Sequence, residues 1–321
     1  MKDAWGRTIE YVRLSLTDAC NFCCPYCRPA EITPQSQTQL LSVDEWMTIL
    51  GAFHRIGVKA VRLTGGEPLL YPHIEELLAR IKQTGWFEDI SMTTNGSLLA
   101  PRAAKLKELG LNRVNISLDS LDSDAFALCV GKANQLDSVL NGIQSAIDAG
   151  FTSVKINTVL SRHWTDDEVR DLLTYVETWP VIWRFIEYMP FQGDAFHGPT
   201  FDEWKAQLER VSGGPLTEVH SVYGFGPATY LALPSGKAVG FIFSMSHSYC
   251  DTCNRVRLTS DGQMRLCLLR DDEADLVSLV RNGATEEDLA LHIERALQRK
   301  QERHDGVGME QPERPMWRIG G

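Results

Sequence analysis

Apolar and polar residues follow two recurring patterns between residue 11 and about residue 190. Short runs rich in β-branched residues predict strands, and the longer segments between them have the spacing of helices with one buried face. Strands are expected at 11–16, 58–64, 89–94, 112–118, 153–159 and 182–187, and helices near 43–56, 73–84, 100–109, 137–149 and 165–178. Repeated strand–helix units favour a parallel sheet, and six units are fewer than the eight of a closed barrel. The sequence therefore predicts an α/β fold, a partial (β/α)6 barrel of the TIM type with its function at the C-terminal ends of the strands.

The pattern changes after residue 190. The expected order is a loop, a helix at 201–211, antiparallel strands within 217–246, a hairpin over 255–266 that turns at Asp261 and Gly262, and helices near 272–281 and 285–302. The segment from 303 is polar and glycine-rich. We therefore expect a barrel over 1–195, an α+β extension over 196–302 and a tail over 303–321.

Composition and charge narrow the class of protein. The chain has 321 residues, 43% of them hydrophobic and 23% charged, which is typical of a globular protein. It contains no run of eighteen apolar residues, and its first ten residues do not resemble a secretory signal. These features predict a cytoplasmic protein with no membrane contact. The net charge of −10 argues against nucleic-acid binding, so an anionic ligand would need a local cluster of Arg and Lys.

Six of the eight cysteines form two groups of three. The first triad follows a predicted strand and the second lies near the other end of the chain; they are Cys20, Cys24 and Cys27, and Cys250, Cys253 and Cys267. In an intracellular protein such groups are typical of metal or redox sites. An iron–sulfur cubane normally takes four cysteines, so three would leave one iron open to a ligand from solution. A zinc site or a reactive dithiol remains an alternative, with Cys23 or His247 as a fourth zinc ligand, although adjacent Cys23 and Cys24 would strain to face one metal.

Several strands that should be buried carry a cation. These are Arg13, Arg62, Lys155 and Arg184. Arg255 and Arg257 lie two residues apart in an extended segment and so share one face. Because isolated buried charges are strongly unfavourable, cations from separate strands of one barrel favour a common ligand with several negative charges. A polyphosphate matches the fork geometry of arginine.

The first triad and its surroundings resemble the radical S-adenosylmethionine (SAM) superfamily. The resemblance is carried by CNFCCPYC at 20–27, TGGEPLL at 64–70, TTNG at 93–96 and NISLDSLD at 115–122. It implies a [4Fe-4S] cluster on the first triad, whose open iron binds SAM and splits it to a 5′-deoxyadenosyl radical. The resemblance also implies that the cofactor contacts Tyr26, Gly66, Ser117 and Met189.

Three further segments narrow the resemblance to the GTP 3′,8-cyclase family, and it covers residues from about 5 to 321. They are RFIEYMP at 184–190, CNRVRLT at 253–259 and the terminal IGG. The family begins molybdenum-cofactor (molybdopterin) biosynthesis by converting GTP to (8S)-3′,8-cyclo-7,8-dihydroguanosine 5′-triphosphate. The resemblance implies a second [4Fe-4S] cluster on the second triad, whose open iron binds guanine.

It also implies substrate and catalytic contacts. Substrate contacts would be Arg13, Arg62, Thr93, Lys155, Arg184, Arg255, Val256 and Arg257, and catalytic residues would be Arg257, Gly320 and Gly321. The Gly-Gly end would reach into the active site, the alternative being a frayed terminus. We further expect a flavodoxin- or ferredoxin-type electron donor, a homodimer and no nucleic acid.

The chain departs from the family pattern at three places. Ala19 and Ala60 replace an Arg and a Lys of other members, and residues 129–132 replace a more usual Thr-Gly-Arg. A specialised relative therefore stays open. Two rival interpretations are a peptide-modifying radical enzyme and a zinc-containing binding protein.

Overall fold

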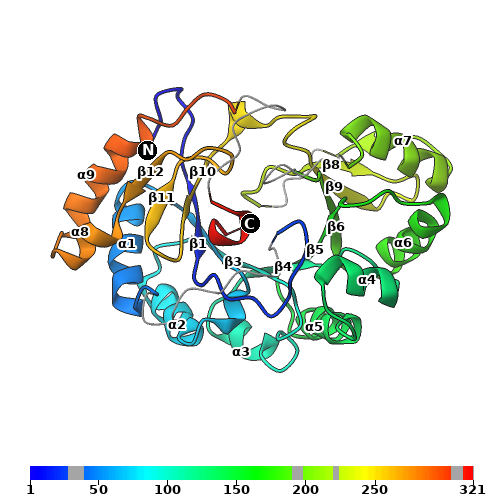
Figure 1. Ribbon diagram of the computed structural model, residues 1–321, viewed down its shortest axis with the longest axis horizontal. Coiled ribbons are helices and arrows are strands. Elements are labelled where there is room, and N and C mark those ends of the chain that lie inside the picture. The colour runs from blue at the N-terminus through cyan, green and yellow to red at the C-terminus, as the bar shows by residue number, and fades with distance from the viewer. Residues whose placement is uncertain (28–39, 190–197, 220–223, 305–313, 321) are drawn as a thin grey trace.

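The computed structural model describes residues 1–27, 40–189, 198–219, 224–304 and 314–320. Its centre is a curved sheet with helices on the outer face (Figure 1). Twelve strands form this sheet, in the order β12-β11-β10-β1-β2-β3-β4-β5-β6-β9-β8-β7. The central run from β10 through β1 and β6 to β9 is parallel throughout, which confirms the predicted parallel α/β architecture.

All six predicted barrel strands are present. They are β1 (Tyr11–Ser15), β2 (Ala60–Thr64), β3 (Asp89–Thr94), β4 (Arg113–Ser117), β5 (Ser153–Val159) and β6 (Ile182–Ile186). The five predicted helices also form, as α1 (Val43–Arg55), α2 (Ile74–Thr84), α3 (Ala103–Glu108), α5 (Leu136–Asp148) and α6 (Asp166–Thr178). A further helix, α4 (Ser123–Val130), was not predicted. The Asp122 side chain caps its first turn and Gly131 ends it in the left-handed conformation, with φ of 64°.

The region after residue 190 continues the same sheet at both edges. The strands β7 (Thr217–Glu218), β8 (Thr229–Ala232) and β9 (Ala238–Ile242) extend it beyond β6. We expected only antiparallel strands here, but β9 pairs parallel with β6 and antiparallel with β8. The prediction followed local hairpin signals, whereas β6 supplies a parallel neighbour from a distant part of the chain.

The other edge contains the predicted hairpin. It is formed by β10 (Arg255–Leu258) and β11 (Gln263–Arg265), with Gly262 at a φ of 80° in the turn. The helix expected near 272–281 is wrong in its first half, because β12 (Glu273–Asp275) pairs with β11 before the short helix α8 (Val277–Arg281) begins. The last predicted helix is α9 (Glu286–Leu297), which ends earlier than expected.

The alternation of side chains along the strands separates the core from the site. Val12, Leu14, Val256 and Leu258 are on one face of β1 and β10 and belong to the hydrophobic core that packs under the helices. Residues at the alternate positions of these strands, such as Arg13, face the concave side of the sheet. The helices α1 and α9 contact each other on one side of the molecule, and α6 contacts α7 (Phe201–Ser212) on the opposite side (Figure 1).

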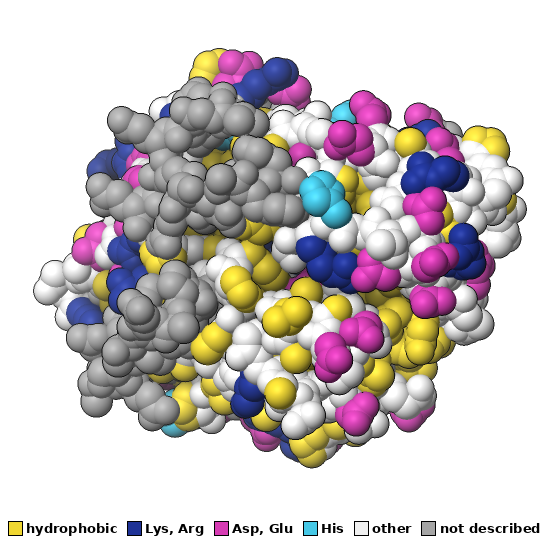
Figure 2. All heavy atoms as spheres, turned by 45° about the vertical axis from the view of Figure 1, so that its right-hand side comes forward, with side chains coloured by type: hydrophobic (Ala, Val, Ile, Leu, Met, Phe, Trp, Pro, Cys, Tyr) yellow, Lys and Arg dark blue, Asp and Glu magenta, His cyan; other side chains and the backbone are white. Residues whose placement is uncertain are grey.

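The described surface is rich in charge of both signs. Acidic side chains lie beside Lys and Arg side chains over much of the face in Figure 2, and surface pairs such as Arg210 with Asp166 illustrate this mixing. Among the described residues, none of the helices combines the length and apolar composition that crossing a membrane requires.

Candidate active site

A cavity of about 220 Å³ lies inside the curve of the sheet. Its wall takes side chains from β1 to β6, β9 and β10 and from the loop after β1. All three thiols of the first triad line it. Among the predicted substrate and cofactor residues, those that line it are Arg13, Tyr26, Arg62, Gly66, Thr93, Ser117, Arg184, Met189, Arg255 and Arg257.

The loop that carries the first triad is held by hydrogen bonds to the end of helix α4 and to the residue that follows β3. The Cys23 N–H donates to the carbonyl of Val130 over 2.9 Å, so Cys23 lies against the end of α4 and is not among the residues lining the cavity. On the other side, the Asn95 side-chain amide lies 3.9 Å from Cys20 Sγ and donates to Asn21 over 2.8 Å. Hydrogen bonds to the end of α4 and to the residue after β3 therefore hold the loop on both sides.

The two glycines after β2 are required by the backbone of the cysteine loop. A Cβ atom on Gly65 would lie 2.4 Å from the Thr17 carbonyl oxygen, and one on Gly66 would lie 2.4 Å from that of Ala19. The Gly66 N–H donates to Thr17 over 2.7 Å. The sequence predicted a cofactor contact at Gly66, which lines the cavity, but the close approach that requires a glycine is between two loops of the chain.

Glu67, which follows these glycines, is completely buried and joins this loop to the end of β3. Its carboxylate accepts hydrogen bonds from Thr94 Oγ1 at 2.8 Å and from the N–H groups of Leu69 and Asn95 at 3.0 and 2.7 Å. Burial raises the pKa of Glu67 to about 7, and these donors oppose that rise. The carboxylate thus fixes the relative positions of the loops after β2 and β3.

Tyr26 is oriented by a buried carboxylate. Its hydroxyl donates to Asp119 Oδ2 over 2.7 Å, and Asp119 Oδ1 accepts from the Val159 N–H over 2.8 Å. Burial raises the pKa of Asp119 to about 6 and that of Tyr26 well above its usual range. Burial and the nearby Cys27, Asp119 and Cys20 likewise raise the pKa of the Cys24 thiol. The immediate surroundings of Cys24 therefore disfavour negative charge on its thiol.

A cluster of cations occupies the wall of the same cavity. Burial lowers the pKa of Arg13 and of Arg184 to about 10, and burial together with Arg13 and Arg255 lowers that of Arg257. Arg184 donates to the neutral side chains of Asn157 and Asn115, at 2.6 Å in each case. Arg13 Nε has no hydrogen-bond partner among the described residues.

A buried arginine outside the cavity has carboxylate partners, unlike the arginines of the cavity wall. Arg265 is fully buried, and its guanidinium pairs with Glu273 at 2.6 Å and with Asp271 at 3.0 Å. In the described part of the chain, no such carboxylate pairs with Arg13, Arg184 or Arg257. The cavity thus concentrates positive charge that a bound anion would balance.

Two predicted substrate residues are not among those lining the cavity. Lys155 is buried on β5, where burial and then Arg184, Arg113 and Arg62 lower its pKa to about 6, so it lies at the edge of the cation cluster. Val256 is 1% exposed and packs in the hydrophobic core on the opposite face of β10 from Arg255 and Arg257. Any contact of Val256 with a ligand would involve its backbone.

The second triad lines its own cavity of about 60 Å³, next to the first. Tyr249, Leu268, Arg255 and Arg257 line both cavities. The two triads therefore line adjacent cavities whose shared wall contains two arginines. This juxtaposition is the arrangement expected if two ligands are to meet between them.

The environment of the second triad favours thiolates. Burial raises the pKa of Cys250, but hydrogen bonds from His304 and Ser248 outweigh it and lower the pKa to about 6. Burial also raises the pKa of Cys253, but the nearby charges of Arg255 and Lys300 outweigh this effect and lower the pKa to about 7. Iron binds the thiolate form, so this donor set suits a cluster.

The histidine proposed for a zinc site lies elsewhere. The His247 ring stacks on Phe201 at 5.1 Å and is not among the residues lining the second cavity, whereas His304 is. Among the described residues, no three His, Cys, Asp or Glu side chains converge on a single metal ion. An iron–sulfur cubane does not require such convergence, because each of its cysteines binds a different iron of the cluster.

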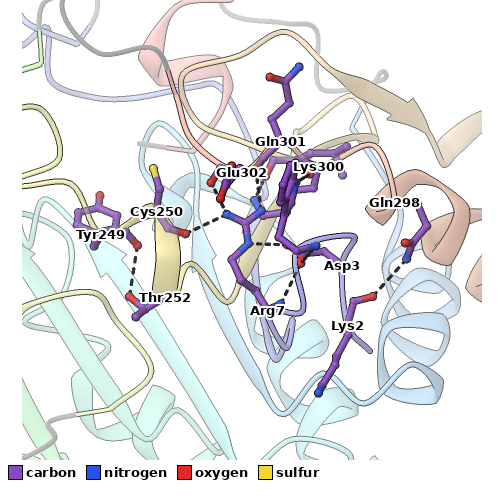
Figure 3. Close-up of polar contacts among 12 residues, drawn as sticks. Lys2, Asp3, Arg7, Tyr249, Cys250, Thr252, Gln298, Lys300, Gln301 and Glu302 are labelled. Carbon is purple, nitrogen blue, oxygen red and sulfur yellow. Dashed lines mark hydrogen bonds and ion pairs between the residues drawn. The ribbon is translucent and has the colours of Figure 1, made fainter.

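The loop of the second triad is anchored by Arg7 (Figure 3). The Arg7 guanidinium donates to the carbonyl oxygens of Cys250, Glu302 and Gln301 at 2.9, 2.6 and 2.7 Å, and to Asp3 at 2.6 Å. The Arg7 side chain is 8% exposed and that of Asp3 is fully buried. One side chain thus joins the N-terminal segment, the cysteine loop and the segment that leads to His304.

The described C-terminal segment, which ends at Gly320, lies inside the curve of the sheet (Figure 1). Arg257 Nη1 donates to the Gly320 carbonyl over 2.7 Å, and a Cβ on Gly320 would lie 2.9 Å from Thr64 and 3.1 Å from Ser15. Ile319 is fully buried and packs with Leu269. The described tail is therefore docked in the barrel and is not a frayed end. Gly321 lies outside the described residues.

Sequence reasoning missed several residues of the two cavities. Tyr11 lies two residues before Arg13 on β1, and Asp119 lies two residues after Ser117, the last residue of β4. Because alternate residues of a strand share a face, this spacing could have indicated both. Tyr249 directly precedes Cys250, which is a weaker signal. His304 lies in the polar tail, where no local pattern marked it.

The arrangement defines a class of protein, a partial-barrel enzyme with one cysteine triad at the carboxyl ends of its strands. Two family models match the chain: the radical SAM superfamily over residues 14–176, and Molybdenum Cofactor Synthesis C over residues 181–306.

Curated relatives narrow the class further. A GTP 3′,8-cyclase of Pelotomaculum thermopropionicum is 39% identical over 100% of both chains, and GTP 3′,8-cyclase 2 of Pseudomonas aeruginosa is 40% identical over 96% of this chain and 94% of its own. Molybdenum cofactor biosynthesis protein 1 of Mus musculus is 37% identical over 100% of this chain and 51% of its own length. The chain therefore belongs to the GTP 3′,8-cyclase family of radical SAM enzymes.

A solved structure supports the fold independently. Streptococcus suis SuiB bound to S-adenosylmethionine superposes with a TM-score of 0.62 over 88% of this chain and 68% of its own, at 16% identity. This likeness concerns the fold alone.

Proposed function

We propose that the chain converts GTP to (8S)-3′,8-cyclo-7,8-dihydroguanosine 5′-triphosphate, the first step of molybdenum-cofactor biosynthesis. The observation that carries the proposal is the placement of both cysteine triads on neighbouring cavities that share Arg255 and Arg257. The names of the relatives, GTP 3′,8-cyclase and molybdenum cofactor biosynthesis protein 1, support it.

The first triad suits a [4Fe-4S] cluster with SAM on its open iron. The bound cluster and cofactor would supply the radical that removes a ribose hydrogen. The role of the chain is to hold the cofactor with Tyr26, Gly66, Ser117 and Met189, and Asp119 fixes the Tyr26 hydroxyl. Enclosure in the barrel excludes water from the reacting groups.

The second triad suits another [4Fe-4S] cluster, whose open iron would bind guanine. From there GTP extends its triphosphate toward the strand cations Arg13, Arg62, Lys155 and Arg184, with the hydroxyl of Thr93 nearby. Thr93 Oγ1 is buried without a partner among the described residues, as expected of a group that waits for a ligand. Arg255 and Arg257 lie between the two clusters, and the Val256 backbone joins them.

Arg257 and the Gly-Gly end are the proposed catalytic residues. Arg257 donates to the Gly320 carbonyl, so it links the tail to the wall that both cavities share. Within this arrangement Arg257 stabilises negative charge on the substrate, and the tail closes the space around it.

The remaining predictions belong to the same proposal. The enzyme works in the cytoplasm with a flavodoxin- or ferredoxin-type electron donor and forms a homodimer. The barrel over 1–195, the extension over 196–302 and the tail over 303–321 would act together, since β9 and β10 of the extension complete the wall of the cavity.

The direct test is anaerobic incubation of the reconstituted chain with GTP, SAM and dithionite, followed by mass spectrometry of the nucleotide. We expect a product isobaric with GTP that forms together with 5′-deoxyadenosine. A preparation with about eight irons per chain and absorbance at about 400 nm is the expected starting material. A colourless preparation with stoichiometric zinc would favour the binding-protein alternative and overturn the proposal.

A further inference from the structure

Tyr11 lines the cavity but is not among the predicted substrate or cofactor contacts. It begins β1 and is 1% exposed, and its side chain lines the cavity beside Arg13. Its phenolic oxygen is buried without a hydrogen-bond partner among the described residues. A buried hydroxyl without a partner is costly, so its presence calls for an explanation.

The strand pairing places the Tyr11 ring among the cations. In the sheet, Tyr11 is the neighbour of Arg255 on β10 and of Ala60 on β2. The small side chain of Ala60 leaves room for the ring on that side. The Arg62 guanidinium lies over the ring, 5.3 Å from its centre.

These positions indicate which kind of ligand the Tyr11 hydroxyl can bind. A phenol donates one hydrogen bond, and the arginines around it select for negative charge. The oxygens of a phosphate group accept hydrogen bonds and carry that charge. A neutral base edge would leave the charge of Arg13 and Arg62 uncompensated.

We propose that Tyr11 is a substrate-binding residue whose hydroxyl donates a hydrogen bond to the triphosphate of the nucleotide. This inference rests on the proposed function and adds a neutral donor to a site otherwise built from cations. Because Tyr11 also supports Arg62 through its ring, it positions one cation while it contacts the ligand itself.

The test compares Tyr11→Phe with Tyr71→Phe in the reconstituted enzyme. Both tyrosines are 1% exposed, but the Tyr71 hydroxyl donates to the Leu41 carbonyl over 2.9 Å and Tyr71 does not line the cavity. Both variants keep the ring, so each removes one hydroxyl only. GTP, tripolyphosphate and guanosine serve as ligands in anaerobic calorimetry, and thermal unfolding of the ligand-free protein is the second readout.

Opposite results are expected for the two variants. Tyr11→Phe weakens binding of GTP and of tripolyphosphate by about 10-fold or more, leaves guanosine binding unchanged and does not lower Tm, because the lost hydroxyl has no partner in the free protein. Tyr71→Phe lowers Tm and binds all three ligands as the unchanged enzyme does.

Two results would overturn the inference. One is unchanged affinity of Tyr11→Phe for GTP and tripolyphosphate, and the other is a loss of Tm equal to that of Tyr71→Phe, which would mean that the hydroxyl serves the fold. Both leave the proposed function intact if the unchanged enzyme binds and cyclises GTP. Absence of GTP binding by the unchanged enzyme would instead refute the proposed function itself.

Discussion

The two cysteine triads have the same number of thiols but opposite surroundings. Around the first, burial and neighbouring acidic groups raise the pKa of Cys24, and the partner of Tyr26 is the carboxylate of Asp119. Around the second, donors and cations lower the pKa of Cys250 and Cys253. Since net charge and hydrogen bonds to sulfur set the reduction potential of an iron–sulfur cluster, the two sites would give the same cluster different properties.

The difference matches two different tasks. Asp119, the acidic group beside the first triad, disfavours gain of an electron by a cluster there, so the reduced cluster would be a strong electron donor, as cleavage of SAM requires. A cluster in cationic surroundings is better suited to hold an electron-rich ligand beside Arg255 and Arg257. On the proposed function, one barrel would hold a reducing centre and a ligand-binding centre on neighbouring cavities.

The largest effect is expected from removing one ligand of either triad. Cys267→Ala should lose about half of the iron, abolish cyclisation and keep measurable SAM cleavage, because the first triad does not depend on it. Cys24→Ala is the matched variant and should lose SAM cleavage while the second cluster remains. Iron content with electron paramagnetic resonance checks both. Loss of all iron in Cys267→Ala would show that the two sites are not independent.

The next effect concerns the wall that the cavities share. Arg257→Ala should weaken GTP binding by about 10-fold to 100-fold, because a buried charged donor is lost, while SAM cleavage stays measurable. The mutation also removes the hydrogen bond to the Gly320 carbonyl.

Deletion of Gly320 and Gly321 separates these two roles of Arg257. We expect the truncated chain to lose cyclisation with both clusters intact and with GTP binding less affected than in Arg257→Ala. Titration of GTP against each variant gives the affinities, and full turnover by the truncated chain would mean that the tail has no catalytic role.

A smaller effect tests how the second triad is anchored. Arg7→Gln should destabilise the chain by about 3 kcal/mol, because it leaves Asp3 buried without its ion pair, and it should lower iron occupancy at the second triad only. Arg303→Gln is the control, since Arg303 pairs with Asp251 on the same loop but both side chains are more than half exposed. The control should cost less than about 1 kcal/mol. Equal losses of Tm and iron in the two variants would contradict a special role for Arg7.

The sequence predicted what depends on local pattern and failed where distant segments meet. The six barrel strands follow from the apolar pattern of neighbouring residues, and all six form. The parallel pairing of β9 with β6 depends on a strand far along the chain. The same distinction applies to the site. Arg13 was visible as a cation within a strand, whereas nothing local linked Arg7 or His304 to Cys250.

The finest test uses the pKa of Lys155. Burial and the arginines lower this pKa to about 6, so at pH 7.5 the amine of the free enzyme is mostly neutral. A triphosphate nearby favours the charged form and raises the pKa, so GTP binding should take up close to one proton, and GTP affinity should fall as pH rises from about 6.5 to 8. Calorimetry in buffers of different ionisation enthalpy measures the uptake. Lys155→Met should remove it, while Lys59→Met, whose side chain is half exposed outside the cavity, should not. Uptake that persists in Lys155→Met would assign the proton to another group and separate Lys155 from the triphosphate.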